Sequence, residues 1–120
     1  MMFIKCSVAS TLNIGDIVQY DSSSSTWVAL TSPSANPWGV VVSAPVSDET
    51  EGSSLYLARV QFAGACLAKA SRDIPNDGGS LAVESGGVYV DASGDCGLVA
   101  PNAYNQAARS ANSLVMIHIR

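Results

Sequence analysis

Apolar and polar residues alternate at every second position along much of this chain. At its end, Val115, Ile117 and Ile119 face one side of an extended backbone, and the residues between them face the other side. A period of two is typical of strands with one buried face. This alternation and short apolar runs elsewhere predict strands at 3–9, 16–20, 26–30, 39–44, 55–62, 64–70, 80–84, 87–91, 96–100 and 113–120.

Polar turn sequences separate these segments. The stretches DSSSS at 21–25, PNDGG at 75–79 and DASGD at 91–95 have the composition of tight turns. Only residues 102–111 have the composition of a short helical turn. Many short strands, joined by turns in a chain with 10 glycines, predict an all-β fold. We expect a small β-sandwich or barrel-like domain with antiparallel strands.

The order of the segments occurs twice. CSVAS at 6–10 corresponds to CLAKAS at 66–71, and WGVVVSAP at 38–45 corresponds to CGLVAP at 96–101. This alignment also places Leu55 opposite Leu114. Half of the chain would bury too little surface to be stable alone. We therefore predict one β domain over 1–120, built from two similar halves, 1–61 and 62–120.

The alignment places Gly39 opposite Gly97, each at the start of an apolar strand. Glycine at such a place indicates a tight turn or a close backbone approach that leaves no room for a Cβ. The preceding residues, Trp38 and Cys96, are expected to cap the core. The alternating strand positions predict that the core contains Val18, Val28, Val40, Val42, Leu57, Leu81, Val83, Val88, Val99, Val115 and Ile117.

The low share of charged residues indicates that this chain assembles with a partner or with other copies. Hydrophobic residues make up 48% of the chain and charged residues 13%, with a net charge of −4. Soluble domains carry about twice that share of charge, so we expect a partner or another copy to cover part of the surface. The 6 basic residues are scattered, which argues against nucleic-acid binding. The chain has neither a signal-peptide pattern at its start nor an apolar run of membrane-helix length.

The residues that could carry chemistry favour structural roles. Cys6, Cys66 and Cys96 contain no C-x-x-C pair, which predicts free, mostly buried thiols rather than zinc ligands. Free thiols also suit assembly in a reducing cytoplasm. His118 is the only histidine and lies inside a predicted strand. No G-x-S-x-G motif accompanies it, so we expect a structural or surface histidine.

Residues 91–97 resemble the start of a calcium loop in spacing. Asp91, Ser93 and Asp95 stand two residues apart, but Cys96 replaces the required glycine and Asn102 the bidentate glutamate. A polar turn is therefore expected here, and the acidic stretch 47–52 is expected to be a solvated loop or a contact for a basic partner. We predict no catalytic, cofactor-binding or metal-binding residue, no cofactor and no enzymatic activity.

Glycine-led and alternating motifs follow one another in a fixed order along the chain. They are Gly15-Asp16, Gly39-Val40, Val60 to Gly64, Ala107 to Ala111 and Leu114 to Ile119. This order resembles that of the small tailed-phage capsid decoration, or cement, proteins. Two departures are Gly79-Ser80, where the family often has Gly-Asp, and the interruption of the V-x-V-x-G strand by Phe62-Ala63.

The resemblance implies an all-β structural protein that binds the outside of an icosahedral shell and reinforces it. It implies a homotrimer, assembled in the host cytoplasm, with the major capsid protein as partner and without catalysis, nucleic acid or membrane. The polar loops 47–52 and 21–26 are then candidates for contact with the shell or with solvent. Two alternatives stay open. One is a small enzyme or regulator, and the other is a fibre, baseplate or surface β module that binds a receptor or glycan through Tyr20, Trp27, Trp38 and Tyr89.

Overall fold

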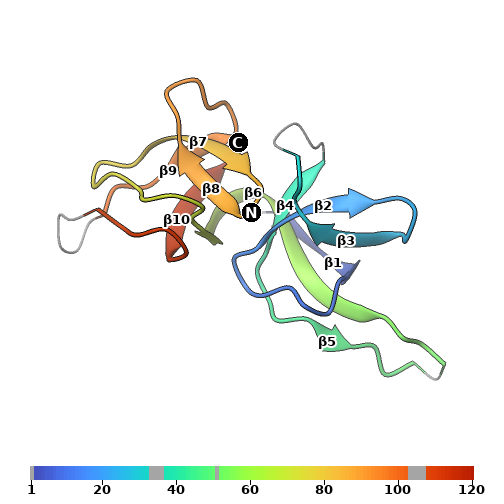
Figure 1. Cartoon of the computed structure of the whole chain (residues 1–120). Helices are drawn as coiled ribbons and strands as arrows, with labels where there is room; N and C mark the ends of the chain where they lie inside the picture. Colours follow the sequence, from blue (N-terminus) through green and yellow to red (C-terminus); the bar gives the residue numbers. More distant parts are fainter. Residues whose placement is uncertain (1, 33–36, 51, 103–107) are drawn as a thin grey trace.

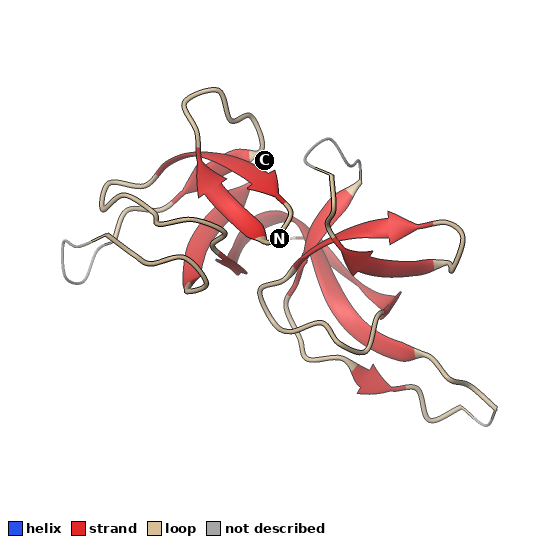
Figure 2. Cartoon of the chain, in the orientation of Figure 1, coloured by secondary structure: helices blue, strands red, loops and turns tan. Residues whose placement is uncertain are grey.

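The computed structural model describes residues 2–32, 37–50, 52–102 and 108–120. All regular secondary structure in these ranges is β (Figures 1 and 2), which confirms the predicted all-β, mainly antiparallel fold. The molecule is elongated, with principal extents of 50 × 28 × 23 Å. Its strands are β1 (Met2–Val8), β2 (Ile17–Asp21), β3 (Thr26–Ala29), β4 (Trp38–Val41), β5 (Val46–Ser47), β6 (Tyr56–Lys69), β7 (Gly79–Glu84), β8 (Gly87–Val90), β9 (Gly97–Val99) and β10 (Leu114–Ile119).

The first part of the chain closes into a five-stranded barrel, which we call barrel 1. β1 pairs in parallel with β3, and the circuit continues through β2, β4 and the first half of β6 back to β1 with antiparallel pairs. Every second residue points inward, because side chains alternate across a strand. The interior of barrel 1 is a buried cluster of Cys6, Val8, Leu12, Val18, Val41, Ala58 and Val60.

The rest of the chain forms a second circuit of the same kind, barrel 2. The second half of β6 pairs with β10, and the ladder continues through β9, β7 and β8. A parallel bridge between Ala70 and Val88 returns it to the end of β6. The interior includes Leu81, Val99 and Ile117, all at most 2% exposed. The two barrels lie side by side along the molecule, and β6 runs through both (Figure 1).

The pairings of barrel 1 recur in barrel 2 residue by residue. Val18 pairs with Ala29 as Leu81 pairs with Val90. Val41 pairs with Val60 as Val99 pairs with Ile117, and the parallel contact of Val8 with Trp27 corresponds to that of Ala70 with Val88. Each strand of barrel 1 thus has a counterpart at the same register, in the order β1 to β6 second half, β2 to β7, β3 to β8, β4 to β9 and β6 first half to β10.

This register corrects part of the sequence alignment. Gly39 and Gly97 hold equivalent places, as the alignment predicts, because Val40 and Leu98 follow them as equivalents. Leu114, however, is the counterpart of Leu57 and not of Leu55. A slip of two residues leaves every side chain on its original face, so the hydrophobic pattern contains no signal that reveals it.

One strand replaces two predicted ones at the junction of the barrels. The expected segments 55–62 and 64–70 are the two halves of β6, so the sequence boundary at 61/62 lies inside this strand. Gly64 adopts a φ of 86° there, a conformation that favours glycine. The buried Gln61 amide donates hydrogen bonds from Nε2 to the carbonyl oxygens of Ala63 at 2.9 Å and Ala65 at 2.8 Å. Gln61 therefore satisfies two carbonyl groups of the strand where it crosses between barrels.

Replacing Gln61 by leucine is expected to destabilise the junction. Gln61→Leu keeps a similar volume but leaves the Ala63 and Ala65 carbonyls without this donor. Each unsatisfied buried polar group costs about 1–3 kcal/mol, so the free energy of unfolding should fall by at least about 1 kcal/mol in urea denaturation. An unchanged urea midpoint and slope would mean that water or a rearranged backbone serves these carbonyls equally well.

Most of the predicted core is buried, and three positions are corrected. Val28, Val42 and Leu57 are only half-buried. In β6 the inward residues are Ala58 and Val60, so Leu57 lies on the outer face. The sequence does not reveal this, because apolar residues occupy both faces there. The predicted positions that are buried are Val18, Val40, Leu81, Val83, Val88, Val99, Val115 and Ile117.

The terminal strand and the paired glycines follow the sequence prediction. Val115, Ile117 and Ile119 point inward. A Cβ on Gly97 would strike the carbonyl oxygen of His118, and a Cβ on Gly39 would lie 2.6 Å from Val60 Cγ1. Trp38 and Cys96 pack against the barrel 2 core cluster. The short β5 lies partly in the predicted loop 47–52. Within the predicted helical turn at 102–111, residues 103–107 lie outside the described residues. The described remainder is not helical, and Arg109 forms an antiparallel bridge with Ile74 instead.

Candidate functional site: an apolar sheet face and a projecting arm

The outer face of barrel 2 carries exposed apolar side chains in adjoining rows. Leu67 on β6 pairs with Met116 on β10, and His118 pairs with Ala65 on one side and Leu98 of β9 on the other. Because paired residues project to the same side of a sheet, these side chains form one surface. We call it the apolar face, made of Ala65, Leu67, Leu98, Leu114, Met116 and His118.

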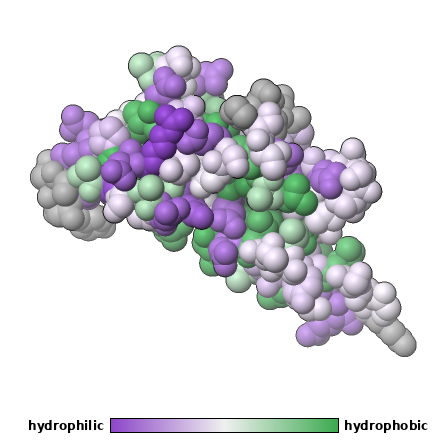
Figure 3. Space-filling view, viewed as in Figure 1, coloured by the Kyte–Doolittle hydropathy of each residue, from purple (hydrophilic) through white to green (hydrophobic). Residues whose placement is uncertain are grey.

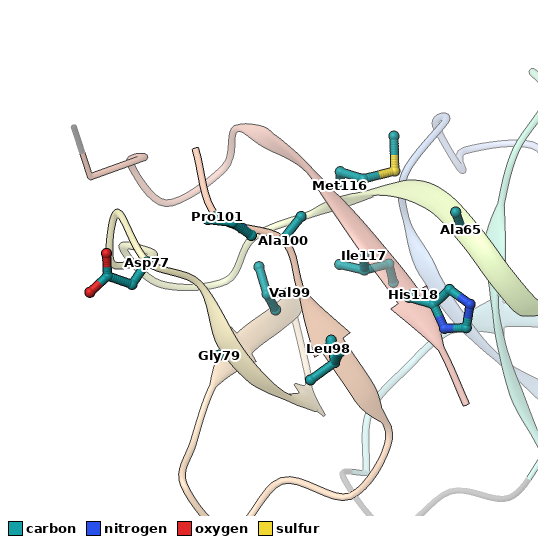
Figure 4. Close-up of a pocket in the computed structure, with 10 residues that line it drawn as sticks. All are labelled: Ala65, Asp77, Gly79, Leu98, Val99, Ala100, Pro101, Met116, Ile117 and His118. Carbon is teal, nitrogen blue, oxygen red and sulfur yellow. The ribbon is translucent and has the colours of Figure 1, made fainter. Parts of the chain in front are cut away.

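A groove of about 410 Å³ runs along this face. Figure 4 shows Leu98, Ala100 and Met116 around it, with Asp77 at one end. Leu98 is 61% exposed, more than any other large hydrophobic side chain in the described part of the chain. Such an exposed apolar surface is typical of an interaction site. Because its polar groups are few, the groove suits another protein surface better than a small polar ligand.

A hairpin projects from barrel 1 at the other end of the molecule (Figure 1). We call residues 44–57 the arm. It contains β5 and the start of β6, which pair at Val46–Leu57 and Ser47–Tyr56. Val46, Leu55 and Tyr56 are exposed on it. In the view of Figure 3, hydrophobic surface extends across the middle of the molecule toward this arm.

The acidic stretch of the arm is held by its own turn. Asp48 accepts hydrogen bonds from the backbone N–H of Thr50 at 3.1 Å, from Thr50 Oγ1 at 2.9 Å and from Ser53 Oγ at 3.1 Å. These bonds favour the ionised form and lower the pKa of the Asp48 carboxyl group, the backbone bond from Thr50 being the largest cause. The arm therefore presents apolar side chains beside a carboxylate that is charged at neutral pH.

The comparisons with known proteins give no family for this chain. Neither a family model, nor a curated protein, nor a solved structure matches it. The apolar face, the groove and the arm are therefore interpreted from their own geometry.

The predicted calcium-like stretch is a hydrogen-bonded turn. Asp91 accepts from the Ser93 N–H at 3.0 Å and from Ser93 Oγ at 2.9 Å, and the Gly94 N–H donates to the Asp91 carbonyl oxygen at 2.8 Å. The same arrangement of Asp21 with Ser23 and Ser24 holds the tip between β2 and β3. Among the described residues, no group of three or more His, Cys, Asp or Glu is placed to hold a metal ion.

His118 lies on the apolar face, between Ala65 and Leu98 across the sheet. Two of the aromatic residues considered for glycan binding, Tyr20 and Trp27, pack together in barrel 1, with ring centroids 5.5 Å apart. Trp27 also packs against Phe62 at 5.1 Å, whereas Tyr89 lies in barrel 2 under the Arg72 guanidinium at 4.0 Å. No helix in the described ranges is long and apolar enough to span a bilayer.

The three thiols are free, as predicted, with Cys6 and Cys66 buried and Cys96 half-buried. Burial raises the pKa of Cys66 to about 11. Burial, followed by the nearby Asp95 carboxylate, also raises the pKa of Cys96. A thiol that stays protonated is a poor nucleophile, so these cysteines act as small apolar side chains.

Stability is expected to fall at high pH through Cys66. The unfolded thiol ionises near its ordinary pKa of 9.0, whereas the folded thiol stays protonated up to about 11. The stabilisation is therefore complete below pH 9.0 and is lost as the pH rises toward about 11. The free energy of unfolding of the wild type should decline more steeply over this range than that of Cys66→Ala. Parallel declines would contradict the assignment.

The sequence indicates some residues of the apolar face as outward-facing, but it does not indicate Leu98 or Val46 of the arm. Met116 and His118 alternate with the buried residues of the last strand, which predicts an outward face. Leu98 and Val46 give no such signal, because each lies in a strand of only two or three residues, too short to show alternation. Only the pairing of β9 with β10 places Leu98 beside His118.

Proposed function

We propose that this chain is a structural capsid decoration protein that binds the outside of an icosahedral phage shell as a homotrimer and reinforces it. The observation that carries the proposal is the pair of separate exposed apolar surfaces, the arm on barrel 1 and the apolar face on barrel 2. A decoration protein that binds as a trimer needs two contacts, one with the shell and one with its own copies. The glycine-led strand order that resembles this family supports the same function.

The arm is the proposed shell contact. It projects beyond the barrel, and projecting loops on a rigid scaffold are common binding elements. Val46, Leu55 and Tyr56 offer apolar contact area, and Asp48 and Glu49 offer negative charge for a basic region of the major capsid protein. The apolar face is then available for contacts between copies.

The test is binding to expanded capsids that lack the protein. The purified chain should co-sediment with such shells and raise the temperature at which they release their DNA. Val46→Glu should weaken this binding at least tenfold, because it places a charge in an apolar contact. As a matched control, Ser22→Glu adds the same charge at an exposed position of the 21–26 tip, outside the arm, and should leave binding unchanged.

Two results would contradict the proposal. If the wild-type chain neither co-sediments with shells nor changes their rupture temperature, the decoration function is wrong. If Ser22→Glu abolishes binding and Val46→Glu does not, the arm is not the shell contact. Binding of the chain to host glycans or receptors in place of shells would favour a surface β module instead.

A further inference from the structure

Equivalent outer surfaces of the two barrels differ in their exposure to solvent. Val40 in barrel 1 is the register counterpart of Leu98 in barrel 2, since Val40 pairs with Gln61 as Leu98 pairs with His118. Val40 is 0% exposed and Gln61 is 2% exposed, whereas Leu98 is 61% exposed and His118 is exposed. The same outer face of the barrel is thus covered in barrel 1 and open in barrel 2.

Barrel 2 itself covers the face of barrel 1. Ile17, Leu30 and Val40 point out of barrel 1 and belong to the buried cluster that contains Cys66 and the interior of barrel 2. A backbone hydrogen bond of 2.8 Å from the Lys69 N–H to the Gly15 carbonyl oxygen also joins the two barrels. The junction is therefore an apolar interface between an outer face of one barrel and the first strand of the next.

The other side of this interface is the first strand of a barrel, which also occurs twice. It is buried around Cys66 in barrel 2 and exposed around Ile4 in barrel 1. Ile4 in β1 is the register counterpart of Cys66 in β6, because Ile4 pairs with Val60 as Cys66 pairs with Ile117. Cys66 is 8% exposed, whereas Ile4 is 56% exposed. The chain thus carries one complete junction, plus an unused face around Leu98 and an unused first strand around Ile4.

We infer that copies of this chain associate head to tail by repeating the junction between their barrels. The start of β1 around Ile4 in one copy lies against the groove of another copy, with Ile4 beside Leu98, as Cys66 belongs to the buried cluster of Val40.

The size of the surface allows such a contact. A specific interface buries about 800 Å² on each partner, roughly an eighth of the 6700 Å² surface of one chain. The two surfaces differ, so the contact is heterologous and closes into a ring if the rotation permits. The inference rests on the proposed self-association and assigns its surfaces; it does not depend on capsid binding.

The test uses two single variants and their mixture. Leu98→Glu and Ile4→Glu each place a charge at an exposed position, so the fold should persist with unchanged circular dichroism. In sedimentation equilibrium each variant should associate at least tenfold more weakly than the wild type. Mixed in equal amounts, the two variants retain one intact contact between them and should form a dimer of about twice the 12.4 kDa chain mass.

Ser22→Glu is the matched control, because Ser22 is exposed but lies on the 21–26 tip, outside the arm and the apolar face. It should leave self-association unchanged. The inference is overturned if the wild type is monomeric at about 100 µM, if the Leu98 and Ile4 variants associate normally, if their mixture does not pair, or if Ser22→Glu disrupts association. Shell binding is measured separately on the same variants, so failure of the head-to-tail contact is distinguishable from failure of the decoration function.

Discussion

Gly97→Ala should lower the free energy of unfolding by at least about 3 kcal/mol, because the new methyl group has no space. Gly97 has a φ of 140°, and a Cβ there would strike the carbonyl oxygen of His118 and lie 3.0 Å from the Arg120 nitrogen. These neighbours are backbone atoms of the adjacent strand, so no side-chain rotation relieves the clash. We expect β9 to separate from β10 or the chain to unfold, visible as a much lower melting temperature.

Gly52→Ala is the matched control for this change. Gly52 also has a positive φ, 81°, but a Cβ there would meet no atom within 4 Å. Its cost is therefore limited to backbone strain of about 1 kcal/mol. Equal losses for the two variants would mean that strain, and not the close approach of β9 to β10, explains why glycine occupies position 97.

Leu81→Ala should cost about 2–5 kcal/mol, as is usual for a large apolar side chain removed from a packed interior. Leu81 is 0% exposed and belongs to the barrel 2 core cluster together with Val99 and Ile117. The strands of barrel 2 surround this position, so the neighbouring side chains can move little to fill the cavity. Urea denaturation monitored by circular dichroism measures the loss.

Leu98→Ala makes the same chemical change on the surface and is the control. Because Leu98 is 61% exposed, its truncation should change the free energy of unfolding of the monomer by less than about 0.5 kcal/mol. The comparison is made at dilutions where the chain is monomeric. A large loss for Leu98→Ala and a small one for Leu81→Ala would show that the inner and outer faces of barrel 2 are exchanged.

The part of the fold that depends on local pattern was predictable. Alternation in the last strand identifies Val115, Ile117 and Ile119 as inward residues, and they are buried. The paired glycines 39 and 97 indicate strands in close contact, and both lack room for a Cβ. Alternation failed at Leu57, where both faces of the strand carry apolar residues and only packing distinguishes them.

The candidate surfaces were less predictable, because they depend on which strands become neighbours. Leu98 and Val40 are alike in the sequence, each an apolar residue directly after a glycine. Their exposures differ because barrel 2 packs on Val40, whereas Leu98 belongs to neither buried cluster and is 61% exposed. The glycine before each residue therefore does not distinguish the buried Val40 from the exposed Leu98.

By itself, the sequence determined an all-β chain with recurring strand order, free thiols and a low charge, because these follow from residue type and from a period of two along the backbone. The tertiary structure alone decided the register between the halves, the single β6 strand through both barrels, and which of two equivalent faces is open. The physical reason is that a slip of two residues, or the burial of one barrel face by another, leaves the local hydrophobic pattern unchanged.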